Sequence, residues 1–261
     1  MATKARQAAD EALTAAPALS QPAPQIHMTL QGKGGVGKSM VSSLLAQYLT
    51  ANGRSVTCID TDPVNDTLSG YTALNARRLD LLQGNQINTR RFDEMMELLV
   101  SEDASVVVDN GAASFLPLTS YMLENGVANL LAASGRQLVV HTVVTGGQAI
   151  MDTLTGFDQL ACQLPESVQM VVWLNEYFGD IQAGGKSFEE MKTYQINKHR
   201  VIGLVRIKRY TGETFGKDME MMLDRKLTFD EAVRSPDFGL MAKQRLTMMK
   251  RDIFQQIALV V

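Results

Sequence analysis

The sequence has few of the residues that mark a secreted, metal-bound or membrane-embedded protein. Its two cysteines, Cys58 and Cys162, lie in apolar segments and lack the spacing of a metal site. We expect small core residues and no disulfide, as in a protein of the reducing cytoplasm. No apolar run is long enough to cross a bilayer, and the N-terminus lacks the apolar stretch of a secretion signal. These absences predict a soluble, cytoplasmic protein.

An excess of positive charge is also missing. The formal net charge of -3 excludes a general attraction to DNA, so any DNA binding must depend on a local cluster of cations. A chain of 261 residues that is 45% hydrophobic can bury one large core. We predict one α/β domain over residues 26–261, preceded by a flexible extension, residues 1–25, rich in alanine and proline.

Short apolar runs recur along the chain and are separated by stretches with helical spacing. This alternation predicts a mostly parallel central sheet flanked by helices. The strands are expected at 26–30, 55–60, 104–108, 138–144, 168–174 and 200–205, and the first helix at 40–49.

A glycine-rich segment, residues 31–39, lies between the first strand and the first helix and matches G-x-x-x-x-G-K-S. Glycines let backbone N–H groups curl around phosphate oxygens, and the helix N-terminus adds partial positive charge. Lys38 can neutralise the terminal phosphates, and the Ser39 hydroxyl can coordinate Mg²⁺. The alternative, a tight turn only, has no use for these two residues. We assign nucleotide binding to Gly34, Gly35, Val36, Gly37, Lys38, Ser39 and Met40.

A second, early lysine distinguishes this loop. With Lys33 in place, the segment resembles the deviant Walker A motif of the ParA/MinD family of ATPases. The resemblance implies a P-loop NTPase of the ParA/MinD type that binds ATP and Mg²⁺. It also implies an ATP-dependent homodimer in which Lys33 takes part in catalysis by reaching the nucleotide of the partner subunit. The alternative is a solvated Lys33 without a role.

Two acids follow the second strand, in Asp60-Thr61-Asp62. Carboxylates at the carboxyl end of a strand lie beside the crevice where open α/β sheets bind ligands. The family resemblance implies that Asp62 orients the water that attacks the γ-phosphate, while Asp60 supports the Mg²⁺ shell. Alternatively, both acids cap the turn at residues 63–66, a role that is compatible with the first.

A third acid, Asp109, ends the apolar strand 104–108, as in a Walker B motif. The resemblance implies that Asp109 holds Mg²⁺ through water. Most family members have a proline shortly after this aspartate, whereas Asn110-Gly111 stands here.

Two polar residues are associated with later strands. Asn175 follows the strand 168–174, where the family has an asparagine that recognises adenine, and its amide both donates and accepts. An asparagine that only ends a strand is an equal alternative. His141 lies in an apolar strand without Cys or His partners at metal spacing, so we predict a hydrogen-bonded core residue.

The C-terminal segment 238–257 has the spacing of an amphipathic helix and carries several cations: Lys243, Arg245, Lys250 and Arg251. A second small basic cluster lies at 206–210. Some members of the family bind membranes through such a helix, and others bind DNA through surface cations. We favour a terminal helix that packs its apolar face on the sheet. DNA binding stays open, and peripheral membrane contact is not favoured.

A narrower resemblance covers residues 26–49 and 58–75, which are similar to conjugal transfer proteins of broad-host-range plasmids. It implies an accessory ATPase of conjugation whose partners belong to the relaxosome or transfer apparatus. Hydrolysis is expected to be slow, Mg²⁺-dependent and stimulated by a partner. The alternatives are a plasmid-partitioning ATPase, a metabolic P-loop enzyme and a nucleotide-binding scaffold without turnover.

Overall fold

The computed structural model describes residues 23–62, 65, 67–84, 86–210 and 212–261. Most of the predicted N-terminal extension therefore lies outside the described residues, as do positions 63, 64 and 66 of the predicted turn. The first strand begins at Gln25, one residue earlier than expected.

Seven strands form one sheet in which every neighbouring pair is parallel. Their order is β11-β8-β7-β1-β6-β2-β3. The parallel sheet and all six predicted strands are confirmed. The strands are β1 (Gln25–Thr29), β2 (Val56–Asp60), β3 (Arg77–Arg78), β6 (Ser105–Asp109), β7 (Gln137–Thr145), β8 (Gln169–Asn175) and β11 (Val201–Ile207).

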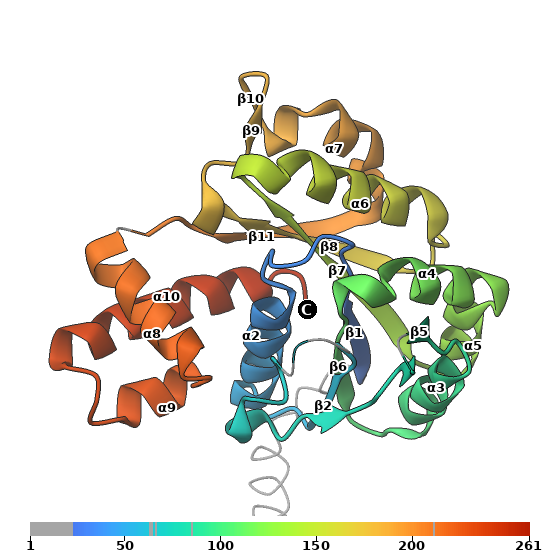
Figure 1. Ribbon diagram of the computed structural model, residues 1–261, viewed down its shortest axis with the longest axis horizontal. Coiled ribbons are helices and arrows are strands. Elements are labelled where there is room, and N and C mark those ends of the chain that lie inside the picture. Colours follow the sequence, from blue (N-terminus) through green and yellow to red (C-terminus); the bar gives the residue numbers. More distant parts are fainter. Residues whose placement is uncertain (1–22, 63–64, 66, 85, 211) are drawn as a thin grey trace, which may run out of the picture.

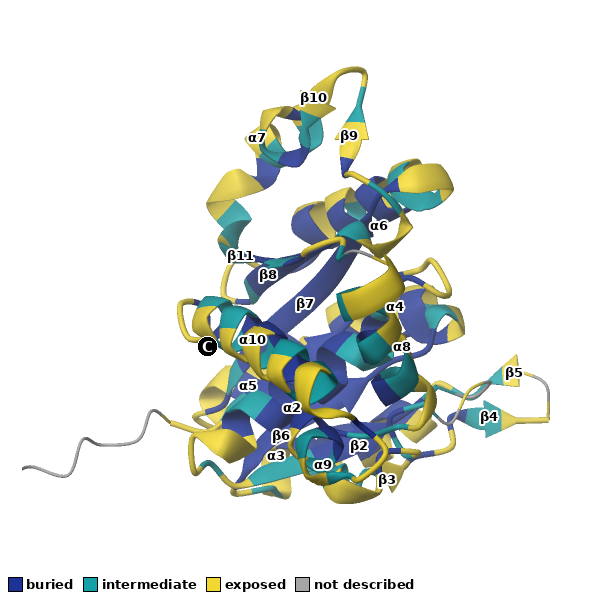
Figure 2. Ribbon diagram, turned by 90° about the vertical axis from the view of Figure 1, so that its left-hand side faces the viewer, coloured by how far each residue is buried: buried dark blue, intermediate teal, exposed yellow. Residues whose placement is uncertain are grey.

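Helices cover both faces of the sheet (Figure 1). One face is covered by α2 (Lys38–Ala51), α8 (Lys217–Asp224), α9 (Phe229–Arg234) and α10 (Leu240–Ile257). The other is covered by α3 (Arg91–Ser101), α4 (Phe115–Glu124), α5 (Val127–Ala133) and α6 (Ile150–Gln163), with α7 (Lys192–Asn197) packed on α6. Two short hairpins, β4–β5 (Leu82–Gln83, Gln86–Ile87) and β9–β10 (Gln182–Ala183, Lys186–Ser187), stand away from the sheet (Figure 2).

The strands are apolar along their length because both faces are buried. Side chains of a strand point alternately to opposite faces. Thus Val106 and Val108 join the core under α3–α6, whereas Val107 joins the core under α2 and α10. This double burial explains why the strands read as continuous apolar runs.

The terminal helix α10 packs its apolar side into the core through Leu246, Met249, Ile253 and Ile257. The favoured interpretation of the C-terminal segment is therefore confirmed. The prediction for the cysteines is right for Cys58, which is buried in β2, and wrong for Cys162, which is exposed. Cys162 lies on the solvent side of α6, and apolar neighbours in the sequence do not reveal which side of a helix a residue occupies.

A buried hydrogen-bonded chain runs through His141, as predicted for a core residue. Trp173 Nε1 donates to His141 Nδ1 at 3.0 Å, and His141 Nε2 lies 3.1 Å from His27 Nδ1. Because indole nitrogen only donates, His141 Nδ1 must accept, which puts the His141 proton on Nε2. Burial lowers the pKa of His27 to about 3 and that of His141 well below its usual value. Both rings are therefore neutral in the folded protein.

We expect this pair to make stability fall in mild acid. Between pH 6.5 and 3 the unfolded chain protonates His27 and the folded chain does not, so the free energy of unfolding should decrease as the pH drops. The slope per histidine is about 1.4 kcal/mol per pH unit. Urea unfolding at several pH values measures it. His27→Gln should show a shallower slope than wild type below pH 6.5; identical slopes would contradict the assignment.

Candidate nucleotide site

The candidate site lies at the carboxyl end of β1, in the middle of the sheet. Here β1 has β6 on one side and β7 on the other, which is where open α/β sheets form a ligand crevice. The glycine-rich loop leads from β1 into α2, with Gly35 and Gly37 at φ values of 72° and 101°. These left-handed conformations favour glycine. The structure therefore forms the loop that the motif predicts.

Lys38, the first residue of α2, is almost fully buried. Its Nζ donates to the Lys33 carbonyl oxygen at 3.1 Å. Burial lowers the pKa of Lys38, and the charges of Asp109 and Asp62 oppose this shift. The loop thus holds a cation that is poorly solvated and lies near two carboxylates. Phosphate oxygens bound in the loop would replace the missing water as hydrogen-bond acceptors for this cation.

Asp109 is completely buried at the end of β6. Its Oδ1 accepts from Ser42 Oγ at 3.1 Å, whereas its Oδ2 has no hydrogen-bond partner in the described part of the chain. Burial and the charge of Asp60 raise the pKa of Asp109 to about 7. The hydroxyls of Ser39 and Ser42 and the charge of Lys38 act in the opposite direction and lower this pKa. A buried carboxylate oxygen without a partner is costly, and a nearby cation would remove that cost.

These residues fit Mg²⁺. The described residues contain no group of three or more His, Cys, Asp or Glu side chains that could hold a metal. Mg²⁺ is commonly bound by one or two protein oxygens together with substrate phosphates and water. Asp109 and Ser39 supply such oxygens beside the phosphate-binding loop.

Asp60 and Asp62 accept backbone N–H groups of the segment that follows β2. Positions 63, 64 and 66 of the predicted turn lie outside the described residues, so capping of that turn stays a prediction. Asp60 accepts from the Asp62 N–H at 3.1 Å and from the Ser69 N–H at 2.8 Å, one bond to each carboxylate oxygen. Asp62 Oδ1 accepts from the Asn65 N–H at 3.3 Å. Both acids nevertheless lie close enough to influence Asp109 or Lys38. The metal and catalytic roles of these two acids stay predictions.

Asn175 contacts the loop directly. Its Nδ2 donates to the Val36 carbonyl oxygen at 2.9 Å, and its Oδ1 accepts from the Tyr177 N–H at 3.2 Å. A Cβ on Gly37 would lie 2.9 Å from Asn175 Nδ2, so this glycine also leaves room for the amide. Asn175 therefore supports the loop. Recognition of a base stays a prediction, for which the amide has a second N–H and a second oxygen lone pair.

Lys33 forms an ion pair with Asp152 of α6, with 2.8 Å between Nζ and Oδ2. The two side chains are 44% and 58% exposed. Lys33 is thus exposed but paired with an acid, which differs from the solvated lysine of the alternative interpretation. An exposed pair of this kind contributes about 0–1 kcal/mol, so Lys33 can leave it at little cost.

Two residues whose roles the sequence did not reveal, Ser42 and Asn110, connect the strands that carry the acids. Ser42 lies 2.8 Å from Thr29 Oγ1 and donates to Asp109, so it links β1 to β6. Asn110 is buried; its Nδ2 donates to the Thr29 carbonyl oxygen at 3.3 Å and its Oδ1 accepts from Thr61 Oγ1 at 3.0 Å. Ser42 follows Ser39 by three residues and so lies on the same face of α2. This spacing could have predicted that the Ser42 hydroxyl lies near the site.

The predicted basic clusters are largely neutralised by neighbouring acids. Arg206 pairs with Glu176 and Glu189, and Lys208 pairs with Asp252. On α10, Arg245 and Lys250 also form ion pairs with acids of other helices. Across the described residues, no helix combines the length and hydropathy needed to span a membrane.

The sheet, the loop and the buried Lys38 together define a P-loop nucleotide-binding protein. The chain belongs to the CobQ/CobB/MinD/ParA nucleotide-binding family, whose domain model matches residues 27–240. The resemblance to ParA/MinD proteins is therefore confirmed.

Individual relatives agree with the narrower resemblance. Two proteins of Escherichia coli named TraL are each 50% identical over 233 residues, which cover 89% of this chain and 97% of each relative. Among solved structures, MinD with Mg-ADP from Pyrococcus horikoshii has a TM-score of 0.50 at 16% identity, with 90% of this chain and 97% of that chain covered. The MinC:MinD complex from Aquifex aeolicus gives 0.50 at 18%, with 89% and 96% covered. The solved structures support the fold.

Proposed function

We propose that this chain is an ATP-binding, slowly hydrolysing dimeric switch that serves plasmid conjugal transfer in the bacterial cytoplasm. The observation that carries the nucleotide part is the buried Lys38 beside Asp109, whose Oδ2 has no hydrogen-bond partner among the described residues. The conjugation part is supported by 50% identity to TraL across nearly the whole chain.

Each residue of the site has a defined task in this proposal. The loop amides and Lys38 bind the β- and γ-phosphates, and Ser39 and Asp109 hold Mg²⁺. The bound ion would neutralise charge that develops on the phosphate oxygens. Asp60 fixes the backbone directly after β2 by accepting the Asp62 N–H. The Asp62 carboxylate is then held where it can orient a water molecule. Such positioning needs no covalent chemistry from the protein.

The proposed role of Lys33 across the dimer is directly testable. Lys33→Ala should bind ATP with an affinity within about threefold of wild type, because the side chain makes only an exposed ion pair in its own subunit. It should lose ATP-dependent dimerisation and with it the turnover. Light scattering with and without Mg-ATP measures the mass, and a phosphate-release assay measures the rate.

Asp152→Ala is the matched control, since it breaks the same ion pair and leaves Lys33 in place. This variant should still dimerise with ATP. A dimer of unchanged stability in Lys33→Ala would remove the trans role and leave nucleotide binding intact.

We propose that the partner is a protein of the conjugation apparatus. Arg206, Lys208, Arg245 and Lys250 already have acidic partners, which lowers the positive charge that the two predicted basic clusters present to a DNA backbone. Binding of the ATP-bound dimer to non-specific duplex DNA, with steep loss of affinity in salt, would instead favour the plasmid-partitioning class.

A further inference from the structure

A cavity lies at the C-terminal end of α2, and no residue of the nucleotide loop lines it. It has no part in the mechanism above. Its volume is about 550 Å³, it is open to solvent on one side, and its walls come from α2, the start of β2, the short helix η1 (Thr72–Leu74) and α9. This volume falls in the range of small-molecule sites. Val56, Cys58 and Leu74 contribute apolar surface. Burial raises the pKa of the Cys58 thiol to about 12, so this cysteine acts there as an unreactive apolar group.

The acidic and amide groups around this cavity already have partners. Asp230 accepts from Lys250 Nζ at 2.6 Å. Glu231 Oε2 accepts from both the N–H and the hydroxyl of Thr228, each at 2.8 Å, in a capping box. Gln47 donates to Ser43 and accepts from the Phe229 N–H. These groups have little capacity left for a ligand.

Arg54 is different. It lines the cavity, yet its guanidinium makes no hydrogen bond or ion pair with any described residue, and its Nη1 is buried. Its charge nevertheless helps lower the pKa of His27, so the cation acts on the core. Arg234, also in the cavity wall, is exposed and likewise has no ion pair among the described residues. Burying a charged donor without an acceptor is costly, and an anion would offset that cost.

We infer that this cavity binds a small organic anion. The carboxylate or phosphate of the ligand contacts Arg54 and Arg234, and its apolar part lies on Val56 and Leu74. Arg54 is the specificity residue, because it is the half-buried cation in this wall that has no acidic partner.

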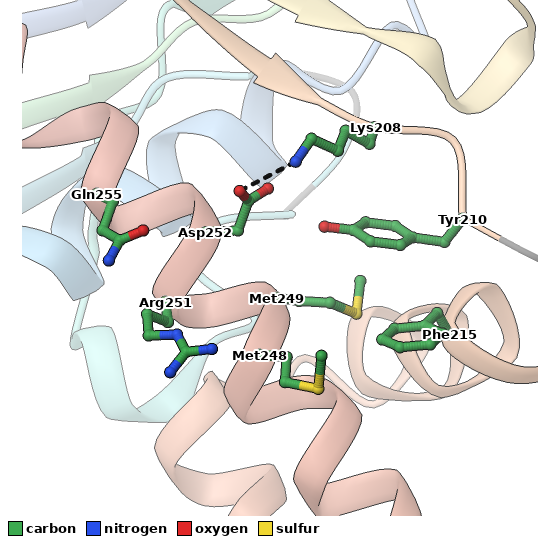
Figure 3. A pocket seen from close by; sticks show the side chains of 8 residues that line it. All are labelled: Lys208, Tyr210, Phe215, Met248, Met249, Arg251, Asp252 and Gln255. Carbon is green, nitrogen blue, oxygen red and sulfur yellow. Dashed lines mark hydrogen bonds and ion pairs between the residues drawn. The ribbon is translucent and has the colours of Figure 1, made fainter.

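The cavity in Figure 3 shows the contrast. It measures about 340 Å³ and lies between the end of β11 and α10. Its Lys208 points at Asp252, with 3.0 Å between Nζ and Oδ1, so this cation is already neutralised (Figure 3). Arg251 at its rim is exposed. The cavity of Figure 3 therefore provides a matched control arginine, Arg251.

The position of the anion site suggests coupling to the nucleotide, a part of the inference that rests on the proposed function. Helix α2 begins at Lys38 and reaches the cavity with Gln47, and the chain reaches η1 after Asp60 and Asp62. A ligand that fixes η1 against α2 should change the affinity for Mg-ATP, and by linkage Mg-ATP should change the affinity for the ligand by the same factor.

The test uses hexanoate, because a phosphate probe would also enter the glycine-rich loop. Titrated into the full chain, hexanoate should shift the amide NMR signals of residues 73–75, and hexylammonium should not. Arg54→Gln should weaken hexanoate binding at least about tenfold, and Arg251→Gln should leave it unchanged. Arg54→Lys, which restores the charge, should recover part of the affinity.

Equal binding of hexanoate to Arg54→Gln and wild type, or equal binding of hexylammonium, would overturn the site, as would the absence of any shift at millimolar hexanoate. Arg54→Gln should unfold at a temperature no lower than that of wild type, since the guanidinium bonds to no described residue and its burial without an acceptor is costly. An unchanged hexanoate affinity in saturating Mg-ATP would overturn the coupling alone. If Mg-ATP itself does not bind, the proposed function fails, while Arg54-dependent hexanoate binding can still be measured.

Discussion

Replacing Lys38 with alanine should abolish ATP binding at physiological concentrations. The substitution removes the buried cation of the glycine-rich loop that we assign to phosphate binding, and each hydrogen bond to a charged group contributes about 1.5–3 kcal/mol. Two such bonds to phosphate oxygens correspond to a loss of at least about 100-fold in affinity. Isothermal titration with ATP in the presence of Mg²⁺ measures the effect.

The fold should survive this change. Burial already disfavours the charged form of Lys38, so little stability depends on its charge, and the aliphatic stem is the main loss. We expect an unfolding temperature close to that of wild type. Lys208→Ala, which removes an exposed lysine outside the nucleotide loop, is the control and should bind ATP normally. Normal ATP binding by a folded Lys38→Ala protein would refute the nucleotide site.

The sequence was informative wherever a physical constraint acts on neighbouring residues. Strands buried on both faces read as apolar runs, so all six long strands were predictable, whereas the two-residue strand β3 is made of Arg77 and Arg78 and carries no apolar signal. The loop was predictable because its function fixes both residue type and spacing over a few positions.

Contacts between distant segments could not be predicted in this way. The ion pair of Lys33 with Asp152 joins the loop to α6, and the bond from Asn175 to the Val36 carbonyl joins β8 to the loop. Each depends on how elements pack in three dimensions. The bond from the Ser69 N–H to Asp60 likewise joins residues nine positions apart, and it decides neither the metal role of Asp60 nor the capping of the turn at 63–66.

Asp62→Ala should separate ATP binding from hydrolysis. The Asp62 carboxylate lies near enough to Lys38 for its charge to oppose the lowering of the Lys38 pKa by burial. It is not among the charges that shift the pKa of Asp109. We expect ATP affinity within about threefold of wild type and a turnover rate reduced at least about 100-fold, the range that general-base or water-positioning groups contribute. Phosphate release with saturating Mg-ATP measures the rate.

A loss of activity in Asp62→Ala has a second explanation, because Asp62 Oδ1 also accepts the Asn65 N–H and so shapes the loop. Asp62→Asn resolves this, since the amide oxygen can still accept that bond while the negative charge is gone. If the carboxylate orients the attacking water, both variants should be inactive and both should form the ATP-bound dimer. Full activity in Asp62→Asn would reduce Asp62 to a capping residue, and full activity in Asp62→Ala would show that hydrolysis, if it occurs, depends on another group.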